Sequence, residues 1–121
     1  MNTRKLTVLT AITGILALGE FASAAMIALG EDGPDHAGWP IAAAFGVFFL
    51  IATWLLSSGR VVAGAIFAGI LCLFEIVGYA SWYKHGALDW TYDTAYALVS
   101  LAGLIGVITV LAGRLRQRAA A

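Results

Sequence analysis

Two glutamates lie inside long apolar segments, and their placement constrains the fold of this chain more than any other feature of its sequence. Glu20 lies within the apolar run Leu6–Leu29, and Glu75 lies within the run Val61–Tyr83. A carboxyl group at membrane depth costs roughly 2.5–3.5 kcal/mol on insertion scales. Any fold for this chain must therefore place both glutamates where packing or function offsets that cost.

Apolar segments dominate the rest of the chain. Of the 121 residues, 61% are hydrophobic and 12% are charged, whereas a soluble domain carries about 25% charged residues. A membrane-spanning helix needs about 20 largely apolar residues, and a spanning β-strand would alternate apolar and polar residues, which these segments do not. Four segments meet or approach the helical length: residues 6–29, 40–57, 61–83 and 94–113. We therefore expect an all-α integral membrane protein with four transmembrane helices, forming a single domain over residues 1–121.

The charges are balanced overall but unevenly distributed along the chain. Five of the seven acidic residues lie in the connections after the first and third predicted helices, whereas six of the seven basic residues lie near the termini or at Arg60. Because cytoplasmic loops are enriched in lysine and arginine, we expect an inner (plasma) membrane protein with both termini in the cytoplasm. The first apolar run continues past the small residues 22–24 to Leu29, which favours a retained helix over a cleaved signal peptide.

The two outer connections hold acidic residues and both histidines, at residues 31–36 and 84–93. Carboxylates would attract hard cations and histidines would suit transition metals, but their spacing fits no defined metal-binding loop. Neither histidine lies at membrane depth, where a haem would need it. We therefore predict no metal site and no cofactor. The basic tail at residues 114–118 is short, and we expect it to contact anionic lipid rather than nucleic acid.

The two glutamates are the last residues of two similar seven-residue segments, which indicates an internal repeat. Five of the seven positions in Gly14–Glu20 are identical to the corresponding positions in Gly69–Glu75. The second and fourth predicted helices also end alike, with a leucine, small residues, a glycine and an arginine. We interpret the chain as a tandem duplication of a two-helix hairpin, with repeats at about residues 1–58 and 59–121. Parallel repeats imply a pseudo-two-fold axis along the membrane normal, which would bring both glutamates to one depth.

Few hydrogen-bond donors surround the glutamates in this arrangement. Tyr79 lies one turn beyond Glu75 on the same helix face, and an antiparallel fourth helix brings Ser100 to roughly the depth of Glu75, with Tyr96 one turn nearer the outer side. We therefore predict Tyr79, Tyr96 and Ser100 as hydrogen-bond partners of Glu75, whereas Glu20 has fewer polar neighbours. Burial among so few donors favours the neutral acid, so we expect at least one protonated carboxyl group at neutral pH.

In outline, the chain length, the four predicted helices and a glutamate in the first helix resemble the small multidrug resistance transporters. The second glutamate at position 75, the internal repeat and the strong charge bias depart from the pattern of that family. No residue role is therefore carried over from it.

Three roles for the glutamates follow from the sequence. As a coupling site for protons or cations, Glu75 would be the main carrier and Glu20 its partner, because intramembrane acids often mark ion pathways. As structural contacts, protonated glutamates would hydrogen-bond between helices or pair with a basic residue of another subunit. Acid–base catalysis is the third role, but no nucleophile, metal cluster or phosphate-binding loop completes a catalytic site, so we do not expect an enzyme.

Among these roles we favour a small ion- or proton-linked transport component in the lipid bilayer. Four short helices leave little room for a sealed pathway within one chain, so we expect a homo-oligomer with the pathway between protomers. The alternative is an accessory subunit or assembly factor of a larger membrane complex, in which the glutamates form interhelical contacts.

Overall fold

The computed structural model describes residues 3–29, 39–81 and 86–120. This part of the chain forms four α-helices: α1 (Thr3–Leu29), α2 (Trp39–Ser57), α3 (Val61–Ser81) and α4 (Ala87–Ala120). All four are long and apolar enough to cross a membrane. The prediction of an all-helical chain with four candidate membrane spans is therefore confirmed.

The fourth helix is longer at both ends than the predicted segment 94–113. Gly86 adopts a φ of 126°, a conformation that glycine reaches without steric cost, and its carbonyl accepts the Trp90 N–H at 3.0 Å. The helix therefore begins directly after Gly86, and the predicted capping pair Asp93-Thr94 lies inside it. At the other end, alanine, leucine and arginine are strong helix formers and carry the helix on to Ala120.

The last two residues of the predicted third helix, 82 and 83, lie outside the described part of the chain. The same is true of the acidic residues and histidines at positions 31–36 and 84–85.

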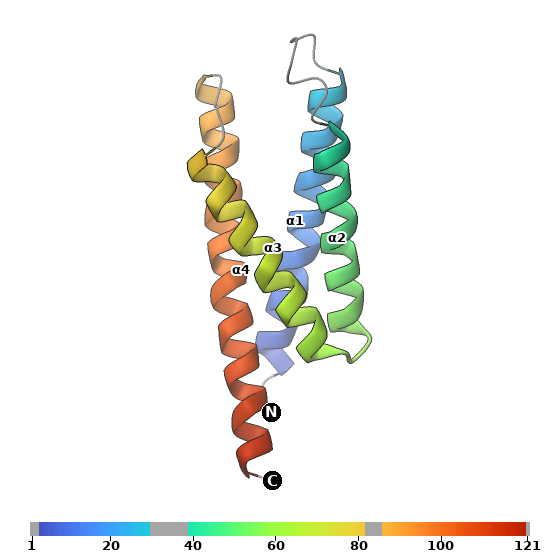
Figure 1. The fold of residues 1–121 in the computed structure, drawn as a ribbon, viewed down its shortest axis with the longest axis vertical. Coiled ribbons are helices and arrows are strands. Elements are labelled where there is room, and N and C mark those ends of the chain that lie inside the picture. The colour runs from blue at the N-terminus through green and yellow to red at the C-terminus, as the bar shows by residue number, and fades with distance from the viewer. Residues whose placement is uncertain (1–2, 30–38, 82–85, 121) are drawn as a thin grey trace.

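The four helices form a closed ring in which each packs against the next in sequence and α4 packs against α1. A tight turn at Gly59, with a φ of 92°, joins α2 to α3 as antiparallel neighbours. Both chain ends lie at the same end of the bundle, the lower end in Figure 1. Helix α3 runs obliquely, from beside α2 at that end to beside α4 at the other (Figure 1).

Two apolar clusters fill the interior on the terminal side of the glutamates. The first cluster joins all four helices through Leu9, Ala52, Leu56, Val61, Ala65, Ala68, Val107 and Val110. The second comprises Leu16, Ala17, Phe49, Leu71 and Cys72. Glu20 and Glu75 follow the second cluster by one helical turn on α1 and α3 respectively. The carboxyl groups therefore form the next interior layer, supported from below by a packed apolar core.

The buried positions of α1 recur in α3 when the two helices are aligned on their glutamates. Five pairs are buried on both helices: Leu9 and Gly64, Thr13 and Ala68, Leu16 and Leu71, Ala17 and Cys72, and Glu20 and Glu75. The two helices therefore turn corresponding faces toward the interior.

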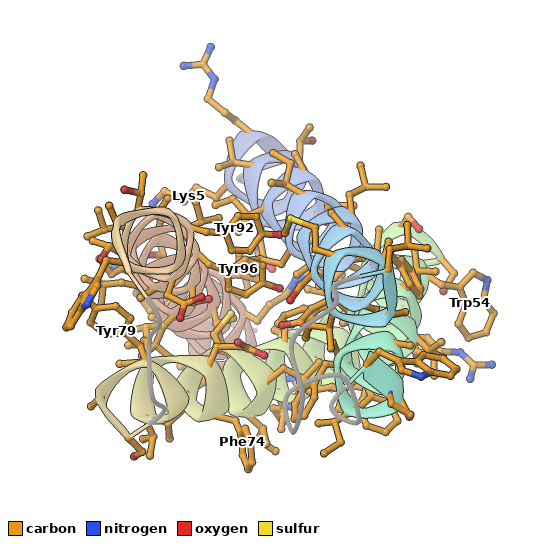
Figure 2. The ribbon with its side chains drawn as sticks, turned by 90° about the horizontal axis from the view of Figure 1, so that it is seen from above. Lys5, Trp54, Phe74, Tyr79, Tyr92 and Tyr96 are labelled. Atoms are coloured by element: carbon orange, nitrogen blue, oxygen red, sulfur yellow. The ribbon has the colours of Figure 1, made fainter. Side chains whose placement is uncertain are left out.

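Large apolar side chains cover the outside of the bundle. Leu18, Ile70, Leu98 and Ile108 are each at least 60% exposed, and Figure 2 shows Phe74 and Trp54 pointing away from the helices. Soluble monomers rarely expose contiguous apolar patches of more than a few hundred Å². This outer surface is compatible with a multi-pass membrane protein.

Candidate functional site: a buried carboxyl pair

Glu20 and Glu75 meet inside the bundle, although their helices are not neighbours in the ring. Their side chains are 7% and 5% exposed, and their carboxyl groups lie within hydrogen-bonding reach of each other. The structure therefore brings together the two residues that the sequence predicts as the centre of a site.

This proximity constrains the protonation of the carboxyl pair. An ionised carboxylate offers only acceptor atoms, whereas a protonated one also has an O–H donor. Two carboxylates at this separation in a low-dielectric interior repel each other strongly. A hydrogen bond between the Glu20 and Glu75 carboxyl groups therefore requires a proton on at least one of them.

Two tyrosines of α4 hold that helix against α1 beside Glu20. The Tyr96 hydroxyl donates to the Leu16 carbonyl at 2.6 Å, and the Tyr92 hydroxyl donates to the Gly19 carbonyl at 2.5 Å. Their rings stack with centroids 6.3 Å apart, and Figure 2 shows both side chains pointing from α4 toward α1. This pair is called the tyrosine clasp below.

Gly19 makes the tyrosine clasp sterically possible. A Cβ atom at this position would lie 2.6 Å from Cε2 of Tyr96, closer than carbon atoms can pack. The Tyr96 hydroxyl also lies within reach of the Glu20 carboxyl. Since its proton points to the Leu16 carbonyl, its oxygen can accept the proton of a neutral Glu20. Tyr96, predicted as a partner of Glu75, thus lies beside Glu20.

The other two predicted partners of Glu75 occupy different positions. The Tyr79 hydroxyl lies 2.9 Å from Oγ1 of Thr94, because Tyr79 is one turn nearer the end of α3 than Glu75 and is level with Thr94 on α4. Ser100 is fully buried. Within the described residues, neither Ser100 Oγ nor Glu75 Oε1 has a hydrogen-bond partner. The predicted bond from Ser100 to Glu75 is therefore not formed.

Ser100 is nevertheless level with Glu75. Two residue pairs define how α3 and α4 are aligned. Tyr79 of α3 is bonded to Thr94 of α4. Cys72 of α3 packs against Gly103 of α4, where an added Cβ atom would lie 2.9 Å from the Cys72 sulfur. Since the two helices are antiparallel, the residue facing Glu75 lies between these two contacts, at about Ser100. This is the depth that the sequence predicts for Ser100.

Sequence reasoning missed Gly19 and Tyr92 as parts of the site. Tyr92 lies before the predicted start of the fourth helix, so the sequence did not predict that Tyr92 and Tyr96 share one helix face. The signal that could have identified both is a glycine directly before Glu20 together with two tyrosines on one helix face.

The described residues include no group of three or more His, Cys, Asp or Glu side chains that could hold a metal ion. Comparison with known protein families, with curated protein sequences and with solved structures found no match for this chain.

Proposed function

We propose that this protein is a small ion- or proton-linked transport component of a membrane, in which Glu75 carries the proton or cation and Glu20 is its partner. The observation that carries the proposal is the contact of two buried carboxyl groups inside four helices that can each span a membrane. Ionisable groups at membrane depth are costly and commonly mark ion pathways.

The two glutamates differ in their surroundings, and this difference supports their separate roles. Glu20 lies beside the tyrosine clasp, and the Tyr96 oxygen can accept a hydrogen bond from the protonated Glu20 carboxyl. Glu75 has an oxygen, Oε1, with no hydrogen-bond partner among the residues that the structure describes. Glu20 therefore has two neighbours within hydrogen-bonding reach, Glu75 and Tyr96, whereas the side-chain neighbour described for Glu75 is Glu20, so Glu75 is the better carrier.

The distribution of charge supports an orientation with both termini in the cytoplasm of a cell with an inner (plasma) membrane. Arg60, Arg114 and Arg118 line a surface pocket of about 280 Å³ at the end that holds the termini. The Arg60 guanidinium lies 5.8 Å from the centroid of the Trp54 ring, a pairing suited to the headgroup region. Arginines in this region would favour the cytoplasmic leaflet, which carries anionic lipid.

The recurrence of buried positions between α1 and α3 supports a tandem duplication of a two-helix hairpin. In a duplicated hairpin the first and third helices are equivalent, so Glu20 and Glu75 would meet at the pseudo-two-fold axis. The interior of one chain on the terminal side of the glutamates is filled by apolar side chains, so a pathway from the carboxyl pair to that side would run between protomers of a homo-oligomer.

Proton flux into sealed vesicles tests this proposal. The full chain is reconstituted with a pH-sensitive dye inside the vesicles, and a potassium diffusion potential drives protons across the bilayer. Glu75→Gln is expected to abolish the protein-dependent flux, because an amide cannot carry a proton in this way. Phe74→Leu is the matched control, since Phe74 neighbours Glu75 but is 53% exposed on the outer surface. Equal flux in Glu75→Gln and wild type would contradict the proposal.

The burial of both glutamates also fits the alternative role, that of an accessory subunit or assembly factor of a larger membrane complex in which the glutamates form interhelical contacts. Purification from native membranes in mild detergent, followed by mass spectrometry, distinguishes the two roles. A homo-oligomer without other subunits supports the transport role. A larger complex that Glu75→Gln dissociates supports the accessory role.

A further inference from the structure

Ser100 is a buried hydroxyl residue whose oxygen has no hydrogen-bond partner among the residues that the structure describes. Six side-chain hydroxyls donate to the backbone carbonyl four residues earlier, the usual arrangement for serine and threonine in helices. They belong to Thr10, Thr53, Ser57, Ser81, Thr91 and Thr109. Ser100 is 0% exposed, yet its Oγ makes no such bond and has no partner among the described residues. A buried hydroxyl without a partner is energetically unfavourable, so a bound guest that contacts this oxygen would be stabilising.

The second unpartnered oxygen, Glu75 Oε1, lies at the same depth on the facing helix. Both side chains are more than nine-tenths buried, and the α3–α4 contacts set Ser100 level with Glu75. Two unpartnered oxygens on facing helices at one depth are the expected ligands of a small guest that prefers oxygen.

The charge of the carboxyl pair defines the charge of that guest. A pair that shares one proton carries a single negative charge, and a buried charge requires a compensating partner. The basic residues that the structure describes lie toward the end of the bundle that holds both termini, away from the carboxyl pair: Arg4, Lys5, Arg60, Arg114, Arg116 and Arg118. A second proton or a monovalent cation can neutralise the pair, and hard cations prefer carboxylate and hydroxyl oxygens.

We propose that Glu75 and Ser100 are ligands of a site for one alkali cation, such as Na⁺ or Li⁺, that exchanges with a proton of the carboxyl pair. This inference rests on the proposed function and names the cation class. The cation replaces the proton on Glu75, which leaves to solvent, while the second proton stays between Glu75 and Glu20. The exchange leaves the charge of the site unchanged, so it avoids burying a net charge.

Other titratable groups surround Glu75 and are part of this equilibrium. They are Glu20 on α1, Cys72 on α3, and Tyr92, Asp93 and Tyr96 on α4. On the α2 side the cluster beneath the carboxyl pair is completed by apolar Phe45 and Phe49. The carboxyl groups among them attract a bound cation. None of these five groups is a basic side chain that would repel it.

Cation-driven proton release tests this inference. The purified full chain is held in detergent in a weakly buffered solution with a pH-indicator dye. NaCl or LiCl is added and compared with choline chloride at the same ionic strength. We expect Na⁺ or Li⁺, but not choline, to release a proton for each cation bound. Glu75→Gln is expected to abolish this release.

Ser100→Ala tests the hydroxyl ligand. It is expected to raise the cation concentration needed for half-maximal release about tenfold, because a hydrogen bond or ligand to a charged group contributes about 1.5 kcal/mol or more. Ser81→Ala is the matched control, since that hydroxyl is exposed and bonds to the Val77 carbonyl. It should leave the release unchanged, and circular dichroism checks the helix content of each variant.

The possible outcomes separate this inference from the proposed function. If wild type releases no more protons with NaCl or LiCl than with choline chloride, the cation site is refuted. An acid–base titration of the same sample then decides the proposed function. A difference between wild type and Glu75→Gln would leave a proton-only site standing, whereas identical titrations would refute both.

Discussion

Substitution of Gly19 by alanine tests whether the tyrosine clasp is as tightly packed as the structure indicates. The added Cβ would lie 2.6 Å from Cε2 and 3.1 Å from Cδ2 of Tyr96, whereas ordinary contacts are 3.4–4 Å. The ring would therefore have to move by roughly 1 Å. Tyr96 cannot turn aside freely, because its hydroxyl is bonded to the Leu16 carbonyl and its ring stacks on Tyr92.

The magnitude follows from three contributions. Overpacking of a tight site costs about 1–3 kcal/mol, and loss of the Tyr96 hydrogen bond adds about 1 kcal/mol. Replacing glycine by alanine in a helix returns about 0.5–1 kcal/mol. The net expectation for Gly19→Ala is a loss of about 1–3 kcal/mol in the free energy of unfolding.

Gly14→Ala is the matched control on the same helix. A Cβ atom at position 14 would meet nothing within 4 Å, so only the gain in helix propensity applies and stability should be unchanged or raised by up to about 1 kcal/mol. Unfolding in mixed detergent micelles, followed by circular dichroism, gives both values. Combining Gly19→Ala with Tyr96→Ala should recover part of the loss, because the clash is then removed. Equal stability of Gly19→Ala and Gly14→Ala would refute the close contact.

Two further stability predictions follow from the carboxyl pair and its surroundings. Glu20→Leu should lower the free energy of unfolding by about 1–3 kcal/mol, because it leaves Glu75 buried without its partner. The double variant with Glu75→Leu should lose less than the sum of the two single losses. Additive losses in the same unfolding assay would show that the carboxyl groups do not interact. Tyr79→Phe should cost about 0.5–1.5 kcal/mol by removing its hydroxyl bond to Thr94, and an unchanged unfolding free energy would show that this bond contributes nothing to α3–α4 packing.

The sequence was sufficient to predict the parts of this structure that depend on composition and spacing. Long apolar runs predict four helices because an unpaired backbone cannot be buried in lipid. The matching phrases that end in Glu20 and Glu75 predict that the two residues share a depth. The depth of Ser100 follows from the antiparallel direction of the fourth helix.

The hydrogen-bond partners could not be predicted in the same way. Asp93-Thr94 has the composition of a helix cap, but the positive φ of Gly86 allows α4 to start earlier. This earlier start makes Tyr92 helical and places it on the same face as Tyr96. The choice between Glu75 and the Leu16 carbonyl as acceptor for Tyr96 depends on helix rotation and on the open space at Gly19. Neither is encoded in hydropathy or residue spacing.

The central claim is that the Glu20 and Glu75 carboxyl groups contact each other and share a proton, and infrared spectroscopy of the purified protein measures this directly. At neutral pH, wild type should show the C=O band of a protonated carboxylic acid that shifts in D₂O, since exposed acids are ionised under these conditions. Glu20→Gln and Glu75→Gln should each shift this band, because each changes the partner of the remaining acid, and the double variant should lose it. Absence of the band in wild type, or a band that one single variant leaves unmoved, would contradict the account.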